Sequence, residues 1–253
     1  MGELSKIQWC DATVNFWMGC QKISPGCKFC YMFRDKYRYG QDPTKVTRTL
    51  DATFYKALTW QDPKIIFTCS WSDFFIDEAD DWRADAWDVI KRTPQHQWLI
   101  LTKRPERIKQ CLPEDWGEGY PNVWLGVSVE SQKYIHRVET LKTIPAKIRF
   151  ISAEPLLEEV DLSGVLVDGT IHWVIIGGES GNENGKYLYR EAEIGWFHKI
   201  IGDCCVTGVS VFNKQLGTHL AKQLKLTDRH GGNADEWDDS LQIRMHPLYV
   251  PRL

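Results

Sequence analysis

Residues 64–73, "KIIFTCSWSD", pass abruptly from an apolar run to a polar cluster. The apolar part is rich in β-branched and aromatic residues and is too short for a helix. Apolar side chains on both faces are typical of a strand that is covered on both sides, as in parallel sheets. The stretch therefore predicts a buried strand whose carboxyl end carries the polar residues Ser70 to Asp73.

The same transition recurs along the chain. Further apolar runs occupy residues 97–102, 122–128, 147–153, 172–178 and 208–213, and they precede "TKRPER", "SVES", "SAEP", "GGESG" and "NKQ". Apolar residues repeat at helical spacing in the intervening segments 77–93, 131–144 and 188–204. Strands that alternate with helices indicate parallel βα units.

The polar strand ends also favour one architecture. In a barrel the carboxyl ends of parallel strands converge on one face, where active sites lie. We therefore predict an α/β fold, a partial (β/α)6-type TIM-like barrel of parallel strands, rather than an open doubly wound sheet. Residues 1–216 are expected to form this barrel with an N-terminal cluster loop. Residues 217–253 are polar and turn-rich and are expected to form a C-terminal extension packed on the barrel.

The bulk properties narrow the class of protein. A chain of 253 residues buries roughly three quarters of its unfolded surface and needs no metal or disulfide to fold. No apolar run is as long as a membrane helix, and no apolar segment typical of a signal peptide follows Lys6. We expect a cytoplasmic protein without membrane contact, whose eight cysteines are thiols or metal ligands. The net charge of −3 gives no global basic field, although Lys and Arg cluster locally.

Residues 19–33, "GCQKISPGCKFCYMF", place Cys20, Cys27 and Cys30 within eleven residues. A structural zinc site needs four ligands, and Cys10 is a candidate for the fourth. A zinc-stabilised, non-catalytic binding module and buried thiols without metal therefore both stay open. Three thiolates on a 4Fe-4S cluster would instead leave one iron free for a substrate or cofactor. A metal-dependent hydrolase is less well supported, since its strand ends should carry His and Asp ligands and histidine is scarce there.

Two resemblances address these alternatives. "CKFC" resembles the Cys-x-aromatic-Cys signature of radical S-adenosylmethionine enzymes, in which the cluster loop follows the first strand of a partial barrel. The first spacing here is Cys-x6-Cys, where Cys-x3-Cys is more usual. Nearly the whole chain is similar to the phage Gp37/Gp68 family, a domain of unknown function that is regarded as radical S-adenosylmethionine-like and distantly similar to spore photoproduct lyase. The matching motifs are "IQWCDATVNFWMGCQKISPGCKFCY", "LTKRPERI", "WLGVSVES", "RFISAEPLL", "WVIIGGESG", "FNKQLG" and "DEWDDSLQIRMHP".

The resemblance implies an enzyme whose 4Fe-4S cluster is held by Cys20, Cys27 and Cys30. The remaining iron would bind the methionyl amine and carboxylate of S-adenosyl-L-methionine. Reductive cleavage would then yield a 5′-deoxyadenosyl radical, with the electron from a donor such as flavodoxin or ferredoxin. The substrate is unknown, and fold-level analogy and phage context alone suggest a nucleic acid or nucleotide. Cys10 is a departure, because Thr is commoner at this position of the family.

The strand ends supply the further candidates. The resemblance implies that Phe29 lies near the adenine. Ser70, Ser72 and Asp73 would hold the methionyl end, and Ser128, Glu130 and Ser131 would contact the ribose. Helix capping is the structural alternative for these polar residues.

Two further strand-end residues are catalytic candidates. Lys103, beside Arg104, would bind the cofactor carboxylate or a substrate phosphate. Cys69 would donate a hydrogen atom to a substrate radical, although a buried cysteine in the core is the commoner outcome. Glu154 and Glu179 would bind polar groups of the cofactor or substrate. The sequence indicates no oligomeric state.

Overall fold

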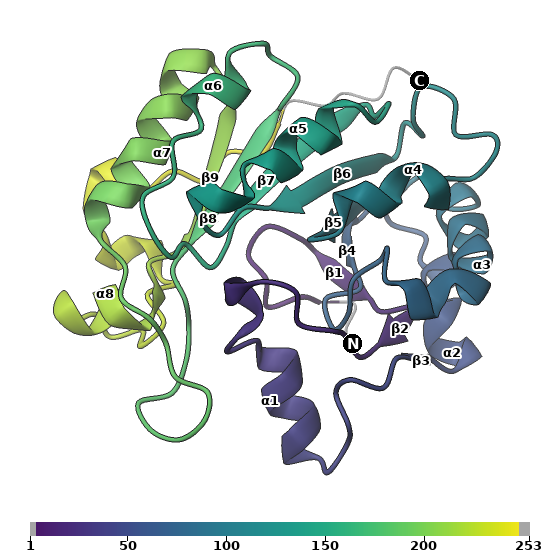
Figure 1. Ribbon diagram of the computed structural model, residues 1–253, viewed down its shortest axis with the longest axis horizontal. Helices are drawn as coiled ribbons and strands as arrows, with labels where there is room; N and C mark the ends of the chain where they lie inside the picture. Colours follow the sequence, from purple (N-terminus) through teal and green to yellow (C-terminus); the bar gives the residue numbers. More distant parts are fainter. Residues whose placement is uncertain (1–3, 248–253) are drawn as a thin grey trace.

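The computed structural model describes residues 4–247, and a curled half-barrel of seven parallel strands forms its centre (Figure 1). Each strand pairs with the next one along the sheet, in the order β1 (Ala12–Val14), β4 (Ile65–Thr68), β5 (Gln97–Thr102), β6 (Val123–Ser128), β7 (Ile148–Ala153), β8 (Trp173–Gly177) and β9 (Ser210–Gln215). The predicted partial barrel is confirmed. The six predicted runs all contain strands, and β1 adds a seventh at one edge of the sheet.

Helices cover the convex face of the sheet (Figure 1). The three segments with helical spacing contain α3 (Asp80–Lys91), α5 (His136–Lys142) and α7 (Ile194–Thr207). The other helices of the barrel are α4 (Ile108–Cys111), α6 (Ser163–Leu166) and α8 (Gly217–Gln223). Helix α7 ends at Gly208, whose φ of 71° is the left-handed conformation in which helices often terminate.

The connection between β1 and β4 carries the cysteines. It contains α1 (Tyr31–Arg38) and α2 (Asp51–Phe54), and β2 (Trp17–Met18) pairs with β3 (Thr47–Arg48) in an antiparallel ribbon. The cysteine loop lies between β2 and α1, so it follows the first barrel strand as the resemblance implied. The indole of Trp17 donates a hydrogen bond to the Asp73 carbonyl (3.0 Å), which joins the ribbon to the barrel.

The strands alternate between two apolar layers. In β6, Val123, Leu125 and Val127 pack in the outer layer beneath the helices, and Trp124 belongs to the inner layer on the concave face. Trp173 lies at the centre of the inner layer and contacts the rings of Trp9, Trp124, Phe150 and Phe212. This aromatic plug fills the interior of the half-barrel. The cavity described below, among the strands' carboxyl ends, includes the hydroxyls of Ser128 and Ser152, which are paired in register.

The chain beyond α8 returns to the edge strand β9. Arg244 forms an antiparallel bridge with Phe212, and its guanidinium donates to the carbonyls of Asn213, Lys214 and Gly232. The division at residue 216 stays a prediction, and residues 248–253 of the proposed extension lie outside the described part. None of the helices in residues 4–247 combines the length and apolar character needed to cross a bilayer.

We expect Gly126→Ala to destabilise the barrel. Gly126 pairs with Phe150 across the sheet, and a Cβ on Gly126 would lie 2.3 Å from Cζ of that ring. Overpacking of this kind costs about 1–3 kcal/mol of the free energy of unfolding, measurable by urea denaturation. Gly202→Ala is the control, because Gly202 faces open space in α7 and alanine there is neutral or stabilising. Equal stabilities of the two variants would contradict the expectation.

Candidate functional site

A cavity of about 600 Å³ opens at the carboxyl ends of the barrel strands. Strand ends, the cysteine loop, the first turn of α1 and the N-terminal segment 4–9 form its wall. The sequence-predicted residues that line it are Cys20, Cys27, Phe29, Cys30, Cys69, Ser70, Ser72, Asp73, Lys103, Ser128, Glu154 and Glu179. Glu130 and Ser131 are absent from this lining. The fold therefore brings most of the candidates together, and their individual roles stay predictions.

Three thiols lie on one side of this cavity. Cys20 precedes a short 3-10 turn that ends at Cys27, and Cys30 is the residue that caps the amino end of α1. All three are free and partly exposed. Nowhere in the described chain do three His, Cys, Asp or Glu side chains converge closely enough to hold a metal ion as they stand. The thiols nevertheless act on one another electrostatically, since thiolates at Cys27 and Cys30 would each raise the pKa of Cys20.

The surroundings of the thiols differ in their effect on ionisation. Burial raises the pKa of Cys20 to about 12. Burial also acts to raise the pKa of Cys27, but the positive charge of Lys103 and polar groups of Ile23 and Ser24 outweigh it and leave that pKa lowered. The pKa of Cys30 is raised by burial, and the amides at the start of α1 oppose this shift. Cys27 is therefore the thiol of this loop that ionises most readily.

The Asp73 carboxylate organises the wall next to Cys20. One oxygen accepts from the Thr102 hydroxyl (2.7 Å), and the other accepts from the Lys103 amide (3.0 Å) and the Arg104 guanidinium (3.1 Å). Arg104 in turn donates to the Gln21 carbonyl (3.1 Å), and its Nη1 lies 4.0 Å from Sγ of Cys20. Asp73 thus holds the Arg104 guanidinium and the backbone of Lys103 beside the cysteine loop.

Glu130 makes a second attachment to the loop. Its side chain is fully buried, and Oε2 accepts from Nη1 of Arg137 at 2.8 Å. Oε1 accepts from the Gly26 amide at 3.4 Å, and a Cβ at position 26 would lie only 3.0 Å from this oxygen. Glycine therefore allows the loop to approach the buried carboxylate closely.

Glu179 and Arg190 make a third attachment. The Glu179 carboxylate accepts from Nε (2.8 Å) and Nη2 (2.5 Å) of Arg190, and Nη1 of Arg190 donates to the Pro25 carbonyl (3.0 Å). The same guanidinium lies 5.4 Å from the centre of the Phe29 ring. Sequence reasoning missed Arg190, because it precedes α7 in a segment without any motif and reaches the site only through the fold.

The serines after β4 are occupied by contacts within the protein. The Ser72 hydroxyl donates to the Gly19 carbonyl (2.5 Å), and the Ser70 hydroxyl pairs with the Asn15 amide group. Tyr31 also joins α1 to this turn, since its hydroxyl donates to the Ser70 carbonyl (2.5 Å). These contacts anchor both ends of the cysteine loop to the turn after β4.

Cys69 and Glu154 complete the cavity wall. Cys69 is buried and adopts a φ of 52°, an uncommon conformation for a residue with a side chain. Burial strongly raises the pKa of its thiol, so the sulfur keeps its proton. Glu154, which follows β7, pairs with Nζ of Lys214 (2.8 Å), and its carboxylate lies over Gly177, where a Cβ would be 2.8 Å away.

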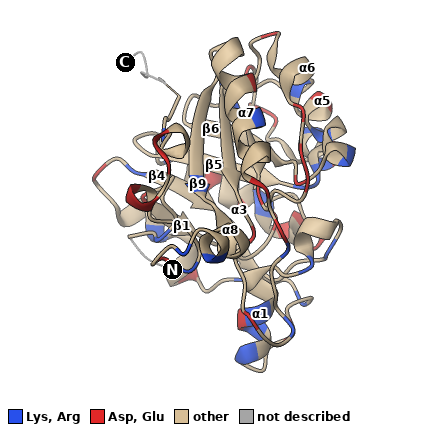
Figure 2. Ribbon diagram, turned by 90° about the vertical axis from the view of Figure 1, so that its left-hand side faces the viewer, with Lys and Arg blue, Asp and Glu red and all other residues tan. Residues whose placement is uncertain are grey.

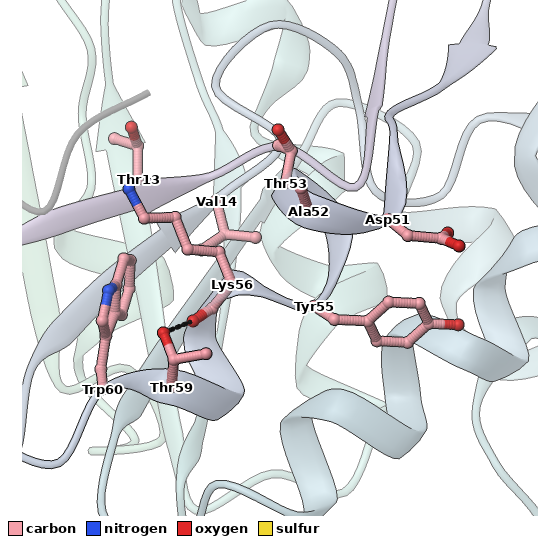
Figure 3. Close-up of a pocket in the computed structure, with 9 residues that line it drawn as sticks. All are labelled: Thr13, Val14, Asp51, Ala52, Thr53, Tyr55, Lys56, Thr59 and Trp60. Carbon is pink, nitrogen blue, oxygen red and sulfur yellow. Dashed lines mark hydrogen bonds between the residues drawn. The ribbon is translucent and has the colours of Figure 1, made fainter.

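A second hollow of about 390 Å³ lies beside the edge strand β1 (Figure 3). Its lining residues are Thr13, Val14, Asp51, Ala52, Thr53, Tyr55, Lys56, Thr59 and Trp60. These nine residues include no cysteine or histidine, and their one carboxylate, Asp51, is paired with Arg48 (2.7 Å). The residues suited to redox or proton-transfer chemistry therefore gather in the larger cavity.

Comparisons with known proteins give two matches. The profile of a family described as "Protein of unknown function (DUF5131)" matches residues 4–244. No curated protein matches this chain. Among solved structures, a variant of spore photoproduct lyase with bound AdoMet and dinucleoside spore photoproduct is similar, with a TM-score of 0.43 and 12% identity. The match covers 76% of this chain and 60% of the length of that chain.

We expect Arg137→Met to lower the free energy of unfolding by about 3–5 kcal/mol, because it leaves the Glu130 charge buried without its partner. Protonation of Glu130 relieves this cost, so the loss relative to wild type should shrink as the pH falls. Urea denaturation at several pH values measures both effects. Arg92→Met, which breaks an exposed pair with Asp88, should cost less than about 1 kcal/mol. A similar, pH-independent loss in both variants would refute the expectation.

We also expect Cys27 to be alkylated faster than Cys20 or Cys30 in the reduced, metal-free protein, because its pKa is lowered and the thiolate is the reactive form. Lys103→Met removes a positive charge, raises the pKa of Cys27 and should slow the reaction about threefold to tenfold at neutral pH. Iodoacetamide labelling with peptide mass spectrometry gives the rates. The exposed Cys205 is the internal reference and should not change. An unchanged Cys27 rate would rule out this role of Lys103.

Proposed function

Because the chain belongs to the DUF5131 family of proteins of unknown function, we propose its reaction from the cavity itself: it is a radical S-adenosylmethionine enzyme. The observation that carries this proposal is the position of Cys20, Cys27 and Cys30. They lie on one loop, at the carboxyl ends of a parallel half-barrel, and they line the same cavity as the polar strand ends. This is the face on which barrel enzymes carry their active sites.

The donor set fits a 4Fe-4S cluster. Thiolates are the ligands that iron–sulfur clusters take, and three of them leave one iron open to a cofactor. Lys103 and Arg104 bring positive charge to the sulfurs of Cys27 and Cys20, which favours the thiolate form that a cluster requires. With S-adenosyl-L-methionine beside it, such a cluster would supply one-electron reductive cleavage and a 5′-deoxyadenosyl radical.

The residues of the wall then take distinct roles. The cavity is large enough for a ligand of this size, and Phe29 offers a ring for the adenine. Lys103 is proposed to bind the methionyl carboxylate or a substrate phosphate. Ser128 is proposed to contact the ribose. Glu130, which lies behind the wall, is assigned the positioning of the cysteine loop.

The remaining polar residues of the proposal divide between the cofactor and the substrate. Ser70, Ser72 and Asp73 are assigned to hold the loop against the methionyl end of the cavity. Glu154 and Glu179, each paired with a cation, are proposed to orient polar groups of the ligands. Cys69 keeps its proton, and it is proposed as the hydrogen donor to a substrate radical.

The identity of the partners is also part of the proposal. A flavodoxin or ferredoxin is the proposed electron donor, and a nucleic acid or nucleotide is the proposed substrate. The motifs quoted above support the phage Gp37/Gp68 name for this group of proteins. The zinc-stabilised binding module is the competing function, and metal analysis separates it from the radical enzyme.

Anaerobic purification or reconstitution should give about four irons and four sulfides per chain, with a broad absorbance band at about 400 nm. Cys27→Ala should lose most of the iron, whereas Cys205→Ala, which removes an exposed thiol on α7, should keep it. Reduction with dithionite in the presence of S-adenosylmethionine should then release 5′-deoxyadenosine. Zinc in place of iron, or no metal after reconstitution, would contradict the proposal that the protein is a radical S-adenosylmethionine enzyme.

A further inference from the structure

A basic and aromatic surface borders the mouth of the cavity. Residues 19–48 carry seven Lys or Arg and only two Asp, in a chain whose net charge is −3. Figure 2 shows this positive charge on α1, which projects from the body of the protein. We call the surface the α1 rim, and its residues are Lys22, Lys28, Tyr37, Arg38, Tyr39 and Lys186.

Side-chain contacts join three segments into this one surface. Nζ of Lys22 donates to the Lys28 carbonyl (2.8 Å) and lies 4.6 Å from the centre of the Phe33 ring on α1. Nζ of Lys186, in the loop after β8, lies 4.8 Å from the centre of the Tyr37 ring. Figure 1 shows that this loop and α1 extend from the same side of the half-barrel.

The cations of the α1 rim have no acidic partners. Lys22, Lys28, Arg38 and Lys186 form no ion pair with any carboxylate of residues 4–247. Some exposed cations elsewhere are paired, such as Lys222 with Glu183 at 2.9 Å, whereas others, such as Lys109 and Lys147, form no ion pair within residues 4–247. The rim is distinguished by the clustering of its unpaired cations. Unpaired positive charge at one place on an acidic protein points to a negatively charged ligand.

The aromatic residues indicate which ligand this is. Tyr37 and Tyr39 are 49% and 69% exposed, and Lys186 lies over one face of the Tyr37 ring. Much of the two rings is therefore in contact with solvent. Cations that contact phosphates, interleaved with aromatic rings on which bases stack, are the features that bind single-stranded nucleic acid. An acidic protein such as an electron donor would use the cations but has no bases to stack on the exposed rings.

We propose that the α1 rim binds single-stranded nucleic acid and directs one nucleotide into the cavity. Helix α1 connects the rim to the cavity, since Tyr31, Met32 and Phe33 in its first turn line the cavity wall, whereas the rim residues themselves lie outside this lining. Enzymes that act on a base take it from a single strand or out of the stack, so a strand held on the rim would present its bases to the cavity. Entry of the nucleotide rests on the proposed function, whereas binding to the rim does not.

The test measures fluorescence anisotropy of labelled single strands of DNA and RNA, about 20 nucleotides long, with the anaerobically purified full chain. Arg38→Glu with Lys186→Glu should weaken binding by about tenfold or more. The slope of log K against log [salt] should become shallower by about 1.4, because two phosphate contacts are lost. Tyr37→Ala should weaken binding roughly tenfold through lost stacking.

The matched control is Lys109→Glu with Lys147→Glu. These lysines are exposed, and Lys109 lies on α4, away from α1 in Figure 1. The control changes the net charge by the same amount and should weaken binding less than about twofold. Equal losses in both double variants, or no binding by the wild type at low salt, would overturn the proposal.

Two further readouts separate the remaining outcomes. If charge reversal on the rim abolishes binding of an acidic flavodoxin and leaves oligonucleotide binding unchanged, the surface belongs to the electron donor and the proposal fails. Iron content is measured in the same samples. Oligonucleotide binding without iron would support nucleic-acid binding by the α1 rim and would contradict the radical enzyme. Iron without oligonucleotide binding would contradict nucleic-acid binding by the rim and would support the radical enzyme.

Discussion

Three buried carboxylates, each paired with an arginine, hold the cysteine loop against the ends of the barrel strands. One member of each pair contacts the backbone of the loop: Arg104 at Gln21, Glu130 at Gly26 and Arg190 at Pro25. The pairs are Asp73–Arg104, Glu130–Arg137 and Glu179–Arg190. Burial of charge is costly, so such pairs contribute less to net stability than to a unique geometry, and here that geometry is the position of the thiols.

The aromatic plug and the cysteine loop lie on two sides of the cavity. Trp173 and its neighbours pack inside the half-barrel, and two residues of the same apolar layer, Trp9 and Phe67, line the cavity. On the other side the cysteine loop and α1 form a wall with partly exposed thiols. The proposed route for the nucleic acid passes beside α1, where the cations of the α1 rim lie. The proposed nucleic-acid binding and the proposed chemistry lie at the same end of the barrel, because all seven strands run parallel and their carboxyl ends meet there.

Several residues predicted to contact ligands turn out to have protein partners. Asp73 uses both oxygens for β5 and Arg104, and Glu130 is fully buried with Arg137. The sequence showed that these carboxylates follow strands, but it did not show which arginine pairs with each of them. A carboxylate at a strand end has the same local pattern whether it faces a ligand or an arginine, so pattern alone cannot distinguish the two.

The sequence by itself determined six of the seven barrel strands, their parallel arrangement and the face that carries the polar residues; the edge strand β1 was missed. These follow from local pattern: short apolar runs form buried strands, and the helical segments between them require crossovers in one direction. Only the tertiary structure decided which polar groups line the cavity, how the loop is tethered and why Lys103 lowers the pKa of Cys27. Those properties depend on distances between segments that are far apart in the chain, such as the contact between Arg190 and Pro25, and no local pattern encodes such distances.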